Sequence, residues 1–237
     1  MKECFPSSKF AAAIAKATEI TSSRVLNRYK GRGLKGREED FSSQLAGEIT
    51  DHLIDQIAAE VGQLSNEKVK FDCLVYKKKT EKVVGADLAG SISYPSQRGS
   101  NPKVYLAQAK IGSIKGSKYS SALNIRAGDK NLLKQCKDML AITPASFVFV
   151  YSEAGVHVVP ASAVVTKGEG IVNTEIDYYK GLDAFYEEVY KCFIGDMSIG
   201  GFYRDEARLK EYAENIAAKR FLHIGIRKMD ERLVEHR

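Results

Sequence analysis

Hydrophobic residues recur along the chain at two spacings, one typical of helices and the other of strands. Between residues 38 and 62 they recur every fourth position, which predicts a long amphipathic helix. Alternation of apolar and polar residues predicts strands, and a short, wholly apolar run predicts a buried strand. The predicted order is a helix over 38–62, strands over 67–76, 83–94 and 103–111, a helix over 130–140 and a strand over 146–151.

Weaker patterns flank this central series. They predict short helices over 6–18, 182–193 and about 204–219, a strand over 156–159 and an edge strand over 221–226. Residues 113–128 are rich in Gly, Ser and Lys and are expected to form an exposed loop. We therefore expect one α/β domain over 1–237, with a mixed sheet flanked by helices. Its core spans about 38–160, an N-terminal helix and basic loop occupy 1–37, and a helical addition occupies 161–237.

Composition narrows the class of protein. The 237 residues are 44% hydrophobic and 28% charged, which is typical of a soluble globular domain and excludes a fibre or a disordered tail. No apolar run approaches the roughly 18–20 residues that a membrane helix needs. The four cysteines are scattered without paired spacing, and the four histidines share no metal-ligand pattern. A cytoplasmic protein without a membrane partner is the expectation.

Positive charge is concentrated near the N-terminus. The net charge is +6, and residues 24–37 contain six basic side chains, three glycines and no acidic residue. A flexible basic loop of this kind suits contact with phosphates, although a solvated surface loop has the same composition. The candidate nucleic-acid-binding residues are Arg28, Lys30, Arg32, Lys35 and Arg37, with Lys115 and Lys118 in the later loop.

Three polar residues lie inside otherwise apolar strands. Gln108 and Lys110 share one face of the strand 103–111, because side chains alternate with period two. Asp87 lies inside the preceding strand, and two neighbouring antiparallel strands can bring it beside them. A carboxylate and a carbonyl oxygen suit Mg²⁺, whose bound water can attack a phosphodiester, and a lysine can orient that water. A buried structural ion pair between Asp87 and Lys110 is the alternative.

These residues and the element order resemble the PD-(D/E)xK nuclease superfamily. Gly85-Ala-Asp-Leu88 followed by Gln108-Ala-Lys110 is similar to its motif in a Gln-x-Lys form, and the resemblance covers roughly residues 38–160. It implies a restriction-endonuclease-like αβββαβ core and metal-dependent cleavage of DNA, in a restriction or antiviral-defence system. Asp87, Gln108 and Lys110 are then catalytic, and Mg²⁺, or Mn²⁺ in its place, is the cofactor. Since restriction enzymes often dimerise to cut both strands, a homodimer is one arrangement that the resemblance allows.

The same resemblance implies an acidic residue near the start of the first core helix. Glu38 and Glu39 are the candidates. Helical phase favours Glu38, because it lies on the same face as the apolar positions of that helix, and Glu39 is the alternative. Glu38 would join Asp87 and Gln108 around the metal and would count among the catalytic residues.

Two departures from the family pattern leave other functions open. Ala86 replaces the proline that names the motif, at a position that is not a ligand. Gln108 replaces a carboxylate, so the site carries less negative charge. A non-catalytic nucleic-acid-binding module of the same fold and an RNA-directed nuclease are therefore the alternatives to a DNA endonuclease.

Overall fold

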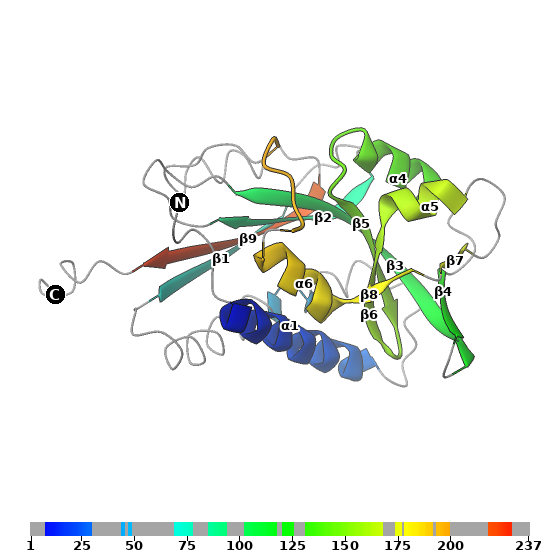
Figure 1. Cartoon of the computed structure of the whole chain (residues 1–237), viewed down its shortest axis with the longest axis horizontal. Helices are drawn as coiled ribbons and strands as arrows, with labels where there is room; N and C mark the ends of the chain where they lie inside the picture. The colour runs from blue at the N-terminus through cyan, green and yellow to red at the C-terminus, as the bar shows by residue number, and fades with distance from the viewer. Residues whose placement is uncertain are drawn as a thin grey trace, which may run out of the picture.

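The structure is a computed structural model that describes residues 8–29, 44–45, 47–48, 69–77, 85–93, 102–117, 120–125, 131–167, 174–176, 178–191, 193–199 and 218–228. The chain is an α/β protein with one mixed sheet and helices on both of its faces (Figure 1). The helices are α1 (Ser8–Tyr29), α4 (Leu132–Leu140), α5 (Ala161–Lys167) and α6 (Leu182–Tyr190). The strands are β1 (Val69–Lys77), β2 (Ala86–Ser93), β3 (Lys103–Ser117), β4 (Ser120–Ile125), β5 (Ser146–Ser152), β6 (Gly155–Pro160), β7 (Thr174–Ile176), β8 (Lys180–Gly181) and β9 (Ala218–Lys228).

The sheet has the strand order β1-β9-β2-β3-β5-β6-β8, and β4 and β7 extend it beside the outer half of β3. Strands β2 and β3 pair antiparallel, and β3 and β5 pair parallel, so the centre of the sheet is mixed. The strands predicted over 67–76, 83–94, 103–111 and 146–151 are all present, as is the helix predicted over 130–140. All seven residues of β5 are buried, as expected for a wholly apolar central strand.

Strand β9 corrects the predicted sheet. The sequence predicted an edge strand over 221–226, but β9 lies between β1 and β2, antiparallel to the first and parallel to the second. Strands β1 and β2 are therefore not neighbours, and a simple β1-β2-β3 meander is not formed. The segment 161–237, expected to add helices, also adds β7, β8 and this internal strand.

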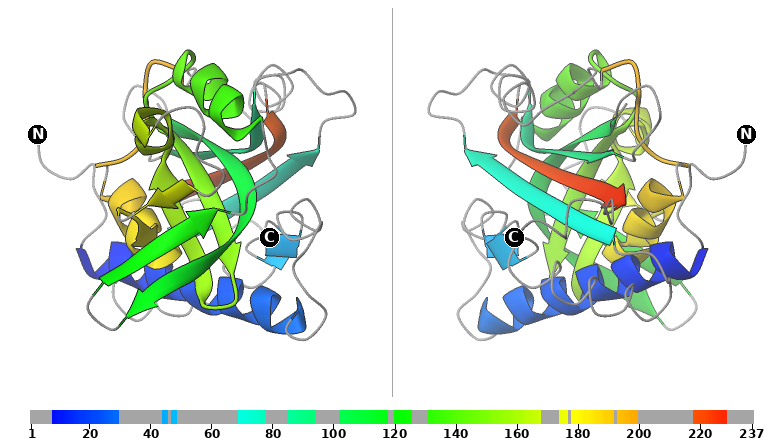
Figure 2. Two further views of the ribbon diagram at one scale, coloured as in Figure 1. Left: turned by 90° about the vertical axis from the view of Figure 1, so that its right-hand side faces the viewer. Right: turned by 90° about the vertical axis from the view of Figure 1, so that its left-hand side faces the viewer.

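The helices cover the two faces of the sheet in pairs. Helices α1 and α6 lie on one face, and α4 and α5 lie on the other (Figures 1 and 2). Two clusters of buried apolar residues match these pairs, one containing residues of α1 and α6 and the other residues of α4 and α5. Of the helices described, none is both long and apolar enough to cross a membrane.

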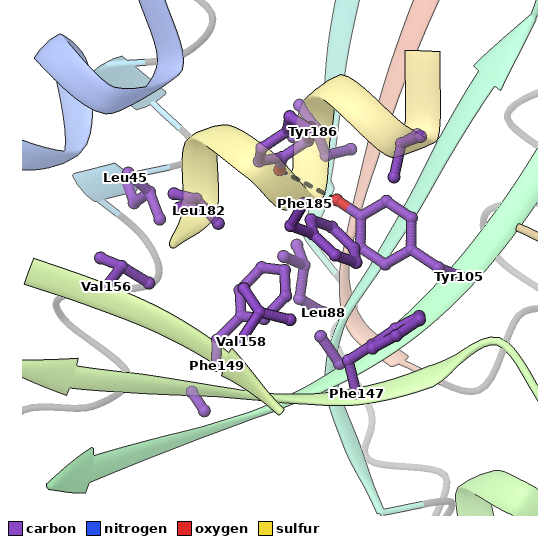
Figure 3. Packing of buried hydrophobic residues seen from close by; sticks show 14 of the residues in the cluster. Leu45, Leu88, Tyr105, Phe147, Phe149, Val156, Val158, Leu182, Phe185 and Tyr186 are labelled. Carbon is purple, nitrogen blue, oxygen red and sulfur yellow. Dashed lines mark hydrogen bonds between the residues drawn. The ribbon is translucent and has the colours of Figure 1, made fainter. Parts of the chain in front are cut away.

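An aromatic cluster fills the face beneath α6 (Figure 3). Phe185 of α6 packs edge-to-face against Tyr105, Phe147 and Phe149, with ring centroids 5.2, 4.9 and 5.3 Å away. The hydroxyl groups of Tyr105 and Tyr186 form a buried 2.9 Å hydrogen bond. Tyr105 lies across Gly90 of β2, where a Cβ atom would fall 2.1 Å from the tyrosine ring. Because Gly90 has no side chain, the Tyr105 ring can occupy this space over β2.

Helix α1 is longer than predicted. The sequence predicted a helix over 6–18 followed by a basic loop from Arg24, but α1 continues to Tyr29 and includes Arg24 and Arg28. Its buried stripe comprises Ala15, Thr18, Thr21, Ser22, Val25 and Leu26. Thr18, Thr21 and Ser22 interrupt the apolar pattern, which resumes at Val25 and Leu26, so the helix continues past the break. The predicted helix over 38–62 is described only at 44–45 and 47–48, which are helical, and Leu45 is buried in the cluster beneath α1 and α6.

The prediction of a loop over 113–128 is wrong for most of that segment. Strand β3 continues to Ser117, and β4 pairs back on it with Gly112 opposite Ile125 and Ser117 opposite Ser120. Small residues predicted a loop here, but cross-strand pairing gives their backbone groups hydrogen-bond partners. Strand β3 therefore runs from the centre of the sheet into a ribbon with β4, and β7 pairs with the other edge of β4.

Candidate active site

Asp87 and Gln108 meet across the β2–β3 pair. The register places Leu88 opposite Ala107 and Ala89 opposite Leu106, so Asp87 lies opposite Gln108. The Gln108 amide Nε2 donates a hydrogen bond to Asp87 Oδ2, and the Ala109 backbone N–H donates to the same oxygen over 3.2 Å. The sequence predicted that neighbouring strands would bring these two residues together, and the structure confirms it.

Lys110 lies on the same face of β3, two residues beyond Gln108. Along this strand Tyr105, Ala107 and Ala109 belong to the cluster beneath α1 and α6, whereas Leu106 belongs to the cluster beneath α4 and α5. The alternation therefore directs Gln108 and Lys110 toward α4.

Burial makes this group of polar residues unusual. Asp87, Gln108 and Lys110 are only 6%, 2% and 8% exposed. Burying a carboxylate and an ammonium group carries a large desolvation cost, and such groups are seldom kept for stability alone.

Helix α4 covers the site. Its residue Cys136 is buried, and the positive charge of Lys110 acts on its thiol. Burial raises the pKa of the Cys136 thiol to about 12, outweighing the opposite effect of Lys110. The thiol is therefore neutral at physiological pH and supplies no nucleophile.

Gly85 sets how closely α4 approaches the start of β2. It has a φ of +72°, and a Cβ atom there would lie 2.6 Å from the backbone oxygen of Gln135 and 2.8 Å from its Cα. The backbone of α4 thus rests directly on the residue two before Asp87. This contact fixes the helix over the site.

Oxygen atoms suited to a metal ion gather around the Gln108 amide. Its Nε2 contacts both the Asp87 carboxylate and the Ala109 backbone carbonyl, the latter over 3.2 Å. The side-chain oxygens of Gln108 and Gln135 are buried without a hydrogen-bond partner. Carboxylate, carbonyl and amide oxygens are the ligands that Mg²⁺ prefers, so the residues fit a hard divalent cation.

Acidic, histidine and cysteine side chains do not form a metal site by themselves within the described ranges. There, no three of them lie close enough together to hold an ion. Glu38 and Glu39, the predicted acidic residues, lie outside the described residues. Asp87 is the carboxylate that the structure shows in contact with Gln108.

The predicted phosphate contacts divide into three groups. Arg28 lies in α1, where it forms an ion pair with Glu48, which corrects its placement in a free basic loop. Lys115 lies on β3 opposite Ala122, in the ribbon beyond the site. The remaining candidates, Lys30, Arg32, Lys35, Arg37 and Lys118, lie outside the described residues.

Another polar pair lies on the sheet beside the site and was not predicted. Ser91 Oγ and His223 Nδ1 are 2.7 Å apart and buried. Period two places Ser91 on the same face of β2 as Asp87, which the sequence could have indicated. Its partner could not be predicted, because His223 reaches β2 only through the internal position of β9.

A surface pocket of about 540 Å³ lies at the other end of β3. Lys103, Phe147, Phe193 and Asp196 are among its lining residues, and none of the predicted site residues is. The Asp196 carboxylate accepts hydrogen bonds from Ser198 and from Thr143, which lower its pKa. The Thr143 bond ties the loop over 193–199 to the turn before β5, and backbone hydrogen bonds between Asp196 and Val104 tie it to β3.

Comparison with known proteins identifies no relative. The chain matches no protein-family model, no curated protein and no solved structure.

Proposed function

We propose that this protein is a metal-dependent nuclease that hydrolyses phosphodiester bonds in DNA. The observation that carries the proposal is the direct contact of Asp87 with Gln108, with Lys110 buried on the same face of the same strand. Oxygen ligands and a lysine, brought together from two adjacent strands, are the groups that this chemistry requires.

The arrangement of elements supports a restriction-endonuclease-like core. Apart from β4, which lies between β3 and α4, the series β1, β2, β3, α4 and β5 follows the order expected for that core, with β3 and β5 parallel. Strand β9 departs from it by separating β1 from β2. The departure leaves the β2–β3 pair intact, and that pair carries the candidate site.

Each residue has a defined part in the proposed reaction. Asp87, the Ala109 carbonyl and the Gln108 side chain would hold Mg²⁺ or Mn²⁺, with Glu38 as a further carboxylate. When bound, the ion would polarise the scissile phosphate and lower the pKa of a coordinated water. Lys110 orients the attacking water and offsets the negative charge that develops on the phosphate. Helix α4 excludes bulk solvent from this face of the sheet.

A non-catalytic nucleic-acid-binding module is the second candidate. The observation that favours it is the neutral Gln108 at the position where the family pattern has a carboxylate. An RNA-directed nuclease would use the same residues on a different substrate.

The test is incubation of supercoiled plasmid, and of a matched RNA, with wild type and Asp87→Asn in Mg²⁺, Mn²⁺ and EDTA. The proposal predicts nicking or linearisation of the plasmid that requires metal and is lost in the variant. Plasmid that shifts on a gel but stays intact would favour the binding module. Cleavage of the RNA alone would favour the RNA-directed nuclease.

A further inference from the structure

The Gln108 amide uses both of its N–H groups to cap oxygens of the candidate metal site. Nε2 donates to the Asp87 carboxylate and, over 3.2 Å, to the Ala109 carbonyl. Its own oxygen, Oε1, is buried and has no hydrogen-bond partner. The amide therefore donates hydrogen bonds to the two oxygens that we propose as ligands of a cation.

Chemistry fixes this orientation of the amide. Turning the group over would bring Oε1 against two acceptors and would leave two N–H donors in the position where Oε1 now has no partner. Both changes are unfavourable in a buried site. The amide is thus one of the donors to these oxygens, beside the Ala109 backbone N–H that also bonds Asp87.

We propose that Gln108 is an amide latch that holds the site in the absence of metal and releases it when a divalent cation binds. This inference rests on the proposed metal site at Asp87. Rotation about the terminal side-chain bond exchanges Nε2 for Oε1, so one residue can serve as donor without metal and as oxygen ligand with it. The hydrogen bonds of Gln108 stabilise the fold in the absence of metal. They also weaken metal binding, because they must break before the cation can reach the two oxygens.

The size of this effect follows from the bonds that are lost. A hydrogen bond to a charged group is worth enough to change affinity by about 10- to 100-fold. Gln108→Glu removes both donors and supplies a carboxylate. We expect this variant to bind Mn²⁺ at least about tenfold more tightly than wild type.

The experiment is a titration of full-length, metal-free protein with Mn²⁺, followed by calorimetry or electron paramagnetic resonance, with thermal unfolding in parallel. In EDTA, wild type stays folded, whereas Gln108→Glu unfolds at a lower temperature than wild type and recovers when Mn²⁺ is added. Asn131→Asp, which adds one negative charge at an exposed position, is the matched control and leaves the affinity within about twofold of wild type.

Gln108→Ala keeps the test decisive if the glutamate variant does not fold. The latch predicts that Gln108→Ala binds Mn²⁺ at least as tightly as wild type, because the loss of a ligand is offset by the loss of the latch. A tenfold weaker affinity in Gln108→Ala, or a Gln108→Glu affinity no tighter than that of wild type, would overturn the latch while leaving the metal site in place.

Failure of the proposed function gives a different result. In that case wild type, Gln108→Glu and Asp87→Asn all fail to bind Mn²⁺. Unfolding of wild type in EDTA at room temperature would also overturn the latch, since it would show that the fold depends on bound metal.

Discussion

Replacing Gly85 with alanine is expected to destabilise the protein by forcing helix α4 away from the start of β2. Two effects contribute. A residue with a Cβ atom at a φ of +72° carries a conformational cost of about 1–2 kcal/mol. The Cβ would also lie 2.6 Å from the Gln135 backbone oxygen, and relief of such overpacking costs about 1–3 kcal/mol.

Together these effects predict a loss of about 2–5 kcal/mol in the free energy of unfolding. Urea denaturation, followed by circular dichroism, measures this loss directly. Gly47→Ala is the matched control, because Gly47 is helical and a Cβ atom there has no neighbour within 4 Å. It is expected to leave stability unchanged or to raise it by up to about 1 kcal/mol.

A second substitution separates the two effects. Asparagine tolerates the left-handed conformation but keeps the Cβ atom, so Gly85→Asn remains close to Gly85→Ala in stability if crowding against α4 dominates. A loss below about 0.5 kcal/mol in Gly85→Ala, comparable with an ordinary surface substitution, would refute the contact between Gly85 and α4 as described.

Three further predictions concern groups outside the metal site. The Cys136 thiol, whose pKa burial raises to about 12, is expected to resist alkylation in the native protein and to react once the protein unfolds, as peptide mapping would show. Burial lowers the pKa of His157, so the unfolded state binds more protons than the folded state. The free energy of unfolding is therefore expected to fall as the pH drops through about 6.5. Denaturation at several pH values should show a smaller fall in His157→Gln, and an identical pH dependence in the two proteins would contradict this. Arg28→Ala is expected to leave the salt dependence of DNA binding unchanged, because Arg28 already pairs with Glu48. If Arg28 contacted a phosphate, its loss would instead reduce the slope of log affinity against log salt concentration by about 0.9.

The sequence predicted the elements that carry the candidate site. Period two along β3 placed Gln108 and Lys110 on one face, and the structure confirms this placement. The sequence also predicted that Asp87 would lie beside Gln108. These residues lie on strands that are consecutive along the chain, and such strands commonly pair antiparallel. The length and phase of α4 followed from its apolar stripe, with Leu132, Cys136 and Met139 buried.

What the sequence did not predict depends on long-range contacts or on polar residues in buried positions. The place of β9 between β1 and β2 is set by pairing across more than a hundred residues, which local patterns do not encode. Thr18, Thr21 and Ser22 interrupt the apolar stripe of α1, so the helix seemed to end early. The β3–β4 ribbon is built from small residues that are typical of loops, and only its cross-strand register identifies it as a sheet.

Lys110 is the residue that we propose to orient the attacking water in metal-dependent cleavage of DNA. The most direct measurement is the initial rate of cleavage of an end-labelled duplex in Mn²⁺ by wild type, Lys110→Met and Lys134→Met. Lys134 is an exposed residue of α4 that pairs with Asp138, so its loss controls for the removal of one positive charge. We expect Lys110→Met to be slower by about a hundredfold or more and Lys134→Met to stay within about twofold of wild type, and we expect EDTA to abolish cleavage. Equal rates for wild type and Lys110→Met, or cleavage that persists in EDTA, would contradict this proposal.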